Sequence, residues 1–179
     1  MSLTLHQKLQ IETALVGIDK KEKYIFESVK MAAARIVELR TKGLYLEVTY
    51  VNSQILEKWL RFIIEIYSIR RKILQLLREA DIHADVKLSL DEEETLGVLI
   101  GILRRFNVDA RFLRLLTDFN EFRKIAIHHL FDGTKDLKSF DDQAKIYFES
   151  KEVKETYEHV EKEIKRLKVE MEQIKKSAT

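Results

Sequence analysis

One stretch of the sequence holds two residue types that can do chemistry together. Arg123 and His128 lie five positions apart inside an otherwise apolar, helix-patterned run. An arginine guanidinium presents a fork of donors that fits phosphate oxygens, and it keeps its charge at physiological pH. A histidine has an ordinary pKa near neutrality, so it can take a proton from one group and give it to another. The pair therefore indicates a site that handles phosphate groups.

This pair could support the cleavage of RNA in which the RNA's own 2'-hydroxyl group is the nucleophile. His128 would serve as base or acid, while Arg123 would hold the phosphate and stabilise the charge that develops on it. Acid-base help of this kind contributes about 10² to 10⁴ in rate. No metal ligands accompany the pair, so we predict neither a metal nor a cofactor. The alternating Asp81, His83 and Asp85 are interpreted as an exposed connection, not as a metal site.

The spacing of the pair constrains how the two side chains could meet. Five residues along an ideal helix rotate by about 140°, so Arg123 and His128 would not share one face. Either the helix is locally distorted, or the residues converge in a groove where another helix or a second subunit packs. We favour a groove between two copies. His129 offers an alternative pairing, further round the helix in the other direction.

Polar neighbours of the motif are candidates for supporting roles. The residue types suggest that Asn120, Lys124 and His129 could assist at the site. Four arginines that precede the motif could steer an RNA backbone, although at least half of them are expected on solvated helix faces. They are Arg104, Arg105, Arg111 and Arg114. The formal net charge of +2 is too small to imply nucleic-acid binding, so any basic surface must be local.

The composition predicts an all-α protein. The 179 residues include no proline and only five glycines, which favours long helices joined by short connections. Hydrophobic residues make up 45% and charged residues 35%, a balance that argues against disorder and membrane residence. Cysteine is absent, which excludes disulfides and thiolate sites. No window approaches 18 apolar residues and the start does not resemble a signal peptide, so we expect a soluble, cytoplasmic, single-domain protein.

The first half of the chain reads as two long helices. Apolar residues recur at steps of four and three between about Thr4 and Lys42, as one helix or as two separated near Gly17, with Gly43 as the C-terminal cap. Residues 44–51 alternate like a strand but would have no partner strand. We therefore predict a second helix from Leu44 to about residue 80, with Trp59 and Tyr67 in its core.

Shorter helices are predicted around the motif. Asp91 is a plausible N-cap for one of them, and Gly97 and Gly101 would allow a neighbouring backbone to approach closely. Asp109 would cap the helix that carries the motif, and that helix should end near Phe131.

The last segment, residues 139–176, is predicted to form one long helix. Apolar residues keep a seven-residue repeat without a miss from Val153 to Ile174, which suits a seam with another helix of the same chain or of a second chain. His159, on this helix, is expected to be exposed.

Around the motif the chain resembles the HEPN superfamily of all-α proteins. These proteins are marked by an arginine, four to six residues and a histidine, which read here as Arg123-Lys124-Ile125-Ala126-Ile127-His128. The short helix and the apolar helix that lead through Asn120-Glu121-Phe122 into the arginine are similar as well. The resemblance implies an antiparallel helical bundle with a core at about residues 44–133, between long N-terminal and C-terminal helices.

The resemblance also implies a function and partners. HEPN proteins dimerise to bring two motifs together, are often metal-independent ribonucleases, and frequently serve in toxin-antitoxin or defence systems beside a nucleotidyltransferase-like antitoxin. Arg123 and His128 would then be catalytic, RNA the substrate and a homodimer the active form. The residue after the arginine is very often asparagine or another small polar residue in the family, and it is Lys124 here. The alternative is therefore a non-catalytic helical module that dimerises or binds a partner and keeps a vestigial motif.

Overall fold

The computed structural model describes residues 4–78, 95–131 and 137–177, in which six α-helices and no strand are found. Side chains are described throughout these ranges except at residues 76–78, 127–131, 137 and 177. The prediction of an all-α fold is confirmed. The helices are α1 (Leu5–Thr41), α2 (Tyr45–Arg78), α3 (Leu96–Leu103), α4 (Ala110–Phe131), α5 (Leu137–Glu149) and α6 (Lys151–Ser177).

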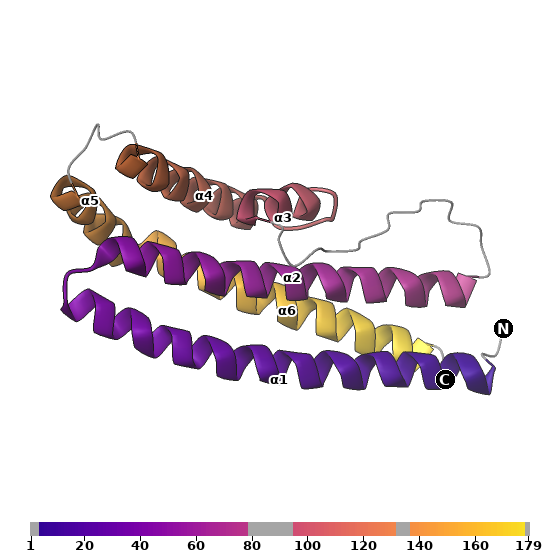
Figure 1. Ribbon diagram of the computed structural model, residues 1–179. Helices are drawn as coiled ribbons and strands as arrows, with labels where there is room; N and C mark the ends of the chain where they lie inside the picture. Colours follow the sequence, from indigo (N-terminus) through magenta and orange to yellow (C-terminus); the bar gives the residue numbers. More distant parts are fainter. Residues whose placement is uncertain (1–3, 79–94, 132–136, 178–179) are drawn as a thin grey trace.

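Helices α1 and α2 form a long antiparallel hairpin (Figure 1). α1 is one uninterrupted helix, and it begins with a capping box in which Thr4 and Gln7 bond reciprocally. It ends at a positive φ of 72° at Gly43, where the N–H groups of Gly43 and Leu44 donate to the carbonyls of Arg40 and Leu39. This pairing is the Schellman motif, so the glycine cap predicted from the sequence is confirmed.

Helix α2 is the centre of the molecule, because it packs against each of the other five helices. Its middle section is buried around most of its circumference, which is the property of a helix enclosed by others. Trp59 and Tyr67 are among the buried residues, as predicted, and the strand-like alternation of residues 44–51 belongs to the first turns of this helix. The fully or almost fully buried residues of this section are Ile55, Leu56, Leu60, Phe62, Ile63, Ile64 and Ile66.

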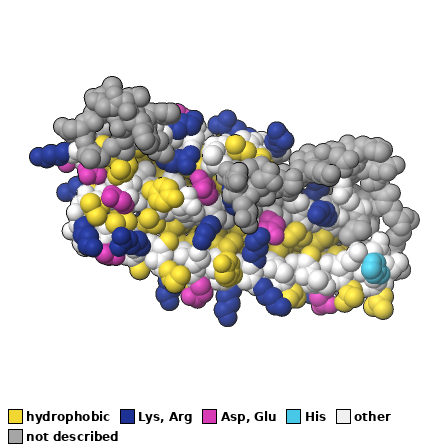
Figure 2. All heavy atoms as spheres, in the orientation of Figure 1, with side chains coloured by type: hydrophobic (Ala, Val, Ile, Leu, Met, Phe, Trp, Pro, Cys, Tyr) yellow, Lys and Arg dark blue, Asp and Glu magenta, His cyan; other side chains and the backbone are white. Residues whose placement is uncertain are grey.

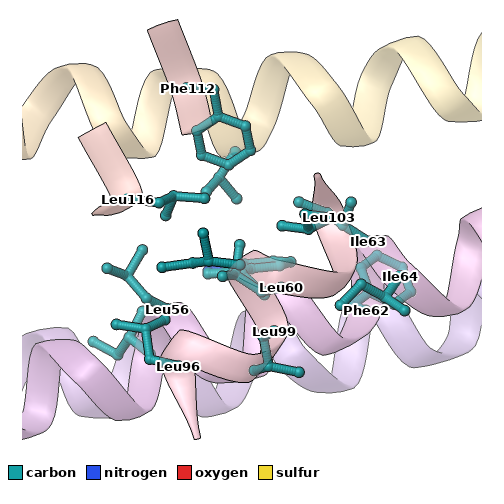
Figure 3. Close-up of a cluster of buried hydrophobic side chains, with 14 of the residues drawn as sticks. Leu56, Leu60, Phe62, Ile63, Ile64, Leu96, Leu99, Leu103, Phe112 and Leu116 are labelled. Atoms are coloured by element: carbon teal, nitrogen blue, oxygen red, sulfur yellow. The ribbon is translucent and has the colours of Figure 1, made fainter. Parts of the chain in front are cut away.

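Helices α3 and α4 cover one side of α2 and complete the main hydrophobic core (Figure 3). Leu96, Leu99 and Leu103 from α3 and Phe112 and Leu116 from α4 meet the apolar residues of α2 there, and each is at most 1% exposed. α3 begins at Leu96, so the prediction that its helix is capped at Asp91 is wrong. Residue 95 already has an extended backbone, and Asp91 lies outside the described residues.

The single C-terminal helix predicted for residues 139–176 is instead two helices, α5 and α6, separated at Ser150. Both the N–H and the hydroxyl of Ser150 donate to the carbonyl of Tyr147, at 3.1 and 2.6 Å. A serine hydroxyl that bonds to a nearby carbonyl in this way competes with helix continuation. The seven-residue repeat lies wholly within α6.

The apolar seam of α6 packs inside its own chain. Val160, Ile164, Leu167 and Met171 are at most 5% exposed and face α2, α4 and α1. A buried polar network also aligns α6 with α2. The Tyr67 hydroxyl donates to the Glu163 carboxylate, and one Nη of Arg166 bonds both groups. Burial and the adjacent carboxylate raise the pKa of Tyr67 above its ordinary value. The sequence left open whether the heptads pair with the same chain or with a second chain. In the structure they pack against helices of the same chain.

Candidate functional site

The helix that carries the motif is positioned at both ends. At its start, Asp109 accepts a hydrogen bond from the Phe112 N–H at 3.0 Å, as the sequence predicted. Nearer its end, Phe122 stacks on Tyr147 of α5 with ring centroids 4.5 Å apart. Phe119 and Phe148 join the same aromatic cluster. The second half of α4 is therefore held against α5, and it runs as a regular α-helix to Phe131.

Arg123 lies in a partly buried polar cluster at the junction of α2, α3 and α4. Its Nη1 is 3.2 Å from Oε1 of Glu57, and its Nη2 donates to Oδ1 of Asn120 at 3.2 Å. The two charged side chains are only 17% and 14% exposed. The Nε atom of Arg123 is buried and has no hydrogen-bond partner in the described part of the chain. Water therefore screens this ion pair much less than it screens a surface pair.

Glu57 also serves the start of α3. Its Oε1 accepts a hydrogen bond from the Leu96 N–H at 3.2 Å, while the side chain of Thr95, at the N-cap position, makes no capping bond. A carboxylate is favoured at a helix N-terminus, where free N–H groups carry partial positive charge. One side chain of α2 thus caps α3 and holds the arginine of α4.

The side chain of Asn120 lies close to Gly97 of α3. A Cβ atom on Gly97 would lie 3.4 Å from Nδ2 of Asn120, at the short limit of an ordinary van der Waals contact. The prediction that a neighbouring backbone approaches Gly97 closely is wrong, because the neighbour is a side chain. At Gly101 a Cβ would meet nothing within 4 Å, so the same prediction is also wrong there.

Among the supporting residues, Asn120 takes part in the cluster and Lys124 does not. Asn120 is 5% exposed and accepts from Arg123. Lys124 lies on the solvent side of α4 and pairs with Glu121 at 2.9 Å. His128 and His129 lie on the last turns of α4, but their side chains are outside the described residues. Because α4 shows no distortion between residues 123 and 128, the backbone alone does not bring the two positions to one face.

The four arginines proposed to steer RNA differ in their contacts. Arg111 faces α6, where it makes a two-pronged ion pair with Glu155 at 2.8 and 2.6 Å. That arginine lowers the pKa of Glu155. Arg104 donates to the Thr117 hydroxyl, and Arg114 lies 3.7 Å from Asp118. Arg105 is exposed. Arg111 is therefore better explained as a link between α4 and α6.

His159 was expected to be exposed and is largely covered. Its ring is stacked on Phe112 with centroids 5.7 Å apart, and its side chain is 16% exposed. Asp109 and Glu155 lie 3.7 and 3.9 Å from its ring nitrogens. The ring therefore packs α6 onto the first turn of α4.

The described ranges hold neither a cluster of metal ligands nor a helix that could span a membrane. These residues contain no group of three or more His, Cys, Asp or Glu side chains that could hold a metal ion. The run from Asp81 to Asp85 lies outside them. None of the described helices combines the length and the apolar character needed to cross a bilayer.

Comparison with known proteins adds no family to this picture. No protein-family model, no curated protein and no solved structure matches the chain.

Glu57 is the site residue that sequence reasoning missed. It is 66 positions away from Arg123, and no spacing rule links two residues so far apart. The one available signal was a carboxylate between the apolar residues Leu56 and Trp59, in the most hydrophobic part of α2. A carboxylate in such a place needs a partner, because an unpaired buried charge is costly.

Proposed function

We propose that this protein is a HEPN-type, metal-independent endoribonuclease in which Arg123 binds the scissile phosphate and His128 transfers the proton. The observation that carries the proposal is the anchoring of Arg123. Only two of its five N–H donors have a partner in the described part of the chain, Glu57 and Asn120. The guanidinium is therefore held in place, and three of its donors, one of them on the buried Nε, have no partner in those ranges.

A preorganised cation of this kind suits phosphate chemistry. Donors that are already oriented do not have to reorganise when charge develops on the phosphate, and that is the main source of electrostatic catalysis. The phosphate would share the guanidinium with Glu57, and Glu57 would keep the fork oriented through its bonds to α3 and α4.

The same proposal includes a homodimer. His128 is five residues beyond Arg123 on a regular helix, so a second motif from another copy is the simplest source of the missing groups. A role as a toxin in the cytoplasm, restrained by a nucleotidyltransferase-like antitoxin, follows from the resemblance to HEPN proteins and is part of the proposal.

A second candidate function, a non-catalytic partner-binding module, is favoured by a different observation. The Arg123–Glu57 pair joins three helices, which explains the arginine without any substrate. Two of the cations on the exposed face of α4 also have acidic neighbours, since Lys124 pairs with Glu121 and Arg114 lies near Asp118. A face neutralised in this way attracts an RNA backbone weakly.

One experiment separates the two functions. Purified protein is incubated with a mixed-sequence RNA in excess EDTA, beside His128→Ala and Arg123→Lys, which keeps the charge but loses the fork. Matched controls are His6→Ala and Arg35→Lys, because both residues are exposed, lie outside the motif and are not among the candidates for RNA binding.

The nuclease proposal expects cleavage by wild type and both controls, with cyclic phosphate ends, and a loss of about 100-fold or more in the motif variants. Circular dichroism of every variant shows whether it is folded. Two outcomes would favour the partner-binding module instead. One is equal cleavage by wild type and folded His128→Ala, and the other is no cleavage by any of the proteins.

A further inference from the structure

A groove of about 1010 Å³ lies between α1 and α6. In Figure 1, α1 lies on the opposite side of α2 from α3. The floor of the groove is Ile55 and Trp59 of α2. Its walls are apolar side chains of α1 and α6, with Phe148 of α5 at one end. The apolar wall residues are Phe26, Val29, Ala33, Ile36 and Val37 on one side and Val153, Tyr157, Val160, Ile164 and Val169 on the other.

The groove exists because α1 and α6 touch only along part of their lengths. Lys168 of α6 reaches Asp19 and Glu22 of α1 at 2.8 and 2.6 Å, and Lys175 lies 3.6 Å from Glu12. These pairs bring α6 to the first half of α1. Towards the second half of α1 the two helices are separated by the groove, so one helix position of the bundle is unfilled there.

Several wall residues are more exposed than their size favours. Phe26 is 58% exposed, Val37 63% and Val169 49%. Figure 2 shows hydrophobic side chains of this kind between Lys and Arg side chains on the α1 side of the molecule. An exposed apolar surface rimmed by charge is characteristic of an interaction site.

Charged side chains that line the groove indicate what it binds. Lys23 of α1 and Lys165 of α6 both line it, and each lies close in sequence to a member of the Lys168–Glu22 ion pair. Neither has an ionic partner within the described ranges, and Arg40, which also lines the groove, has none there either. Glu161 is the acidic lining residue without a partner in the same ranges. Unpaired cations are stabilised by a carboxylate placed near them.

We propose that the groove binds an amphipathic helix of a partner protein, with an apolar stripe against Trp59 and acidic residues beside Lys23, Lys165 and Arg40. Its length along α6, from Val153 to Val169, is about 24 Å, which matches a helix of about 16 residues. A helix laid into an apolar groove is a common recognition mode. The chain's own α1 fits poorly as the guest, because it carries seven Lys or Arg against five Asp or Glu.

The test uses a designed peptide of about 18 residues with leucines at helical a and d positions and glutamates on its flanks. A second peptide carries lysines in place of the glutamates. Trp59 is the only tryptophan of the chain and lines the groove, so its emission reports binding there. Fluorescence titration is expected to show that the acidic peptide binds at least about tenfold more tightly than the basic one, and less tightly at high salt.

Variants locate the binding. Phe26→Asp should abolish the Trp59 response, while Tyr24→Asp should leave it unchanged, because Tyr24 is a neighbouring exposed aromatic, 74% exposed, that does not line the groove. Lys23→Glu combined with Lys165→Glu should reverse the preference between the two peptides.

Three outcomes would overturn the proposal. Equal affinity for both peptides would remove the charge argument, and a response that survives Phe26→Asp would place binding elsewhere. A stable dimer in sedimentation that Phe26→Asp converts to a monomer would mean that a second copy fills the groove. None of these outcomes depends on RNA cleavage.

Discussion

The two sides of α2 differ in how completely they are closed. On one side, α3 and α4 bury Leu96, Leu103 and Phe112 to 1% exposure or less, and the Glu57–Arg123 pair joins the three helices. On the other side, α1 and α6 leave a groove in which Phe26 is 58% exposed. The same central helix thus has one side that is closed by packing and another side that keeps an open apolar groove. Substitutions on the two sides should accordingly affect different measurements.

The largest expected effect is in the closed core. Phe112→Ala removes a ring that is 1% exposed, and it should lower the free energy of unfolding by about 4 kcal/mol because the cavity cannot collapse fully. Phe26→Ala should change it by less than about 0.5 kcal/mol. Urea unfolding followed by circular dichroism measures both. Similar losses at the two positions would mean that the groove is closed in solution.

The next effect belongs to the ion pair. Arg123→Ala leaves Glu57 partly buried without its cation, so the free energy of unfolding should fall by about 2 kcal/mol. Glu57→Gln with Arg123→Gln should cost less than the sum of the two single variants, since they share one interaction. Additive losses in this double-mutant cycle would contradict the role given to the pair.

Substitution of two glycines tests the hairpin of α1 and α2, on the side of α2 that carries the groove. Gly43→Ala should cost about 1 kcal/mol, because its φ of 72° is strained for a residue with a Cβ atom. Gly17→Ala is the matched control. A Cβ there meets nothing within 4 Å and the site is inside a helix, so this variant should gain about 0.5 kcal/mol. Thermal unfolding gives the melting temperature of both variants. Melting temperatures that shift in the same direction for both would contradict the prediction.

The smallest effect concerns the link between α4 and α6. Arg111 lowers the pKa of Glu155, so the pair stabilises the fold above the ordinary carboxyl pKa of 4.5, and this contribution is lost as the pH falls through the lowered value. Arg111→Gln should therefore narrow the difference in melting temperature between pH 7 and pH 3. An unchanged difference would show that the pair adds nothing in solution, as many exposed pairs do.

Much of the fold could be predicted because it depends on local rules. The periodicity of α1 and α2, the glycine at residue 43 and the cap at Asp109 each involve residues a few positions apart. The break at Ser150 was not predicted, because the heptads begin only at Val153 and lie wholly within α6. The competing bonds of Ser150 to Tyr147 involve only short-range geometry, but a serine inside a helical pattern is usually tolerated.

The candidate site was predicted less completely, because its contacts join distant parts of the chain. The motif pointed to Arg123 and Asn120, which do lie together. It could not reveal Glu57 on α2, nor that Arg111 would face Glu155, nor that His159 would stack on Phe112. Each of these contacts depends on how the helices pack, and helix packing cannot be predicted from the spacing of residues within one helix.

The position of Glu57 on α2 has a thermodynamic consequence. Glu57 lies between Ile55 and Trp59 in sequence, so the residue that holds Arg123 and the residues that floor the groove belong to little more than one helical turn. If a guest helix displaces that turn, it alters the strength of the ion pair. Linkage then requires that weakening the ion pair alter the guest's affinity by the same free energy. Such reciprocity would make the two sides of α2 a single regulated unit.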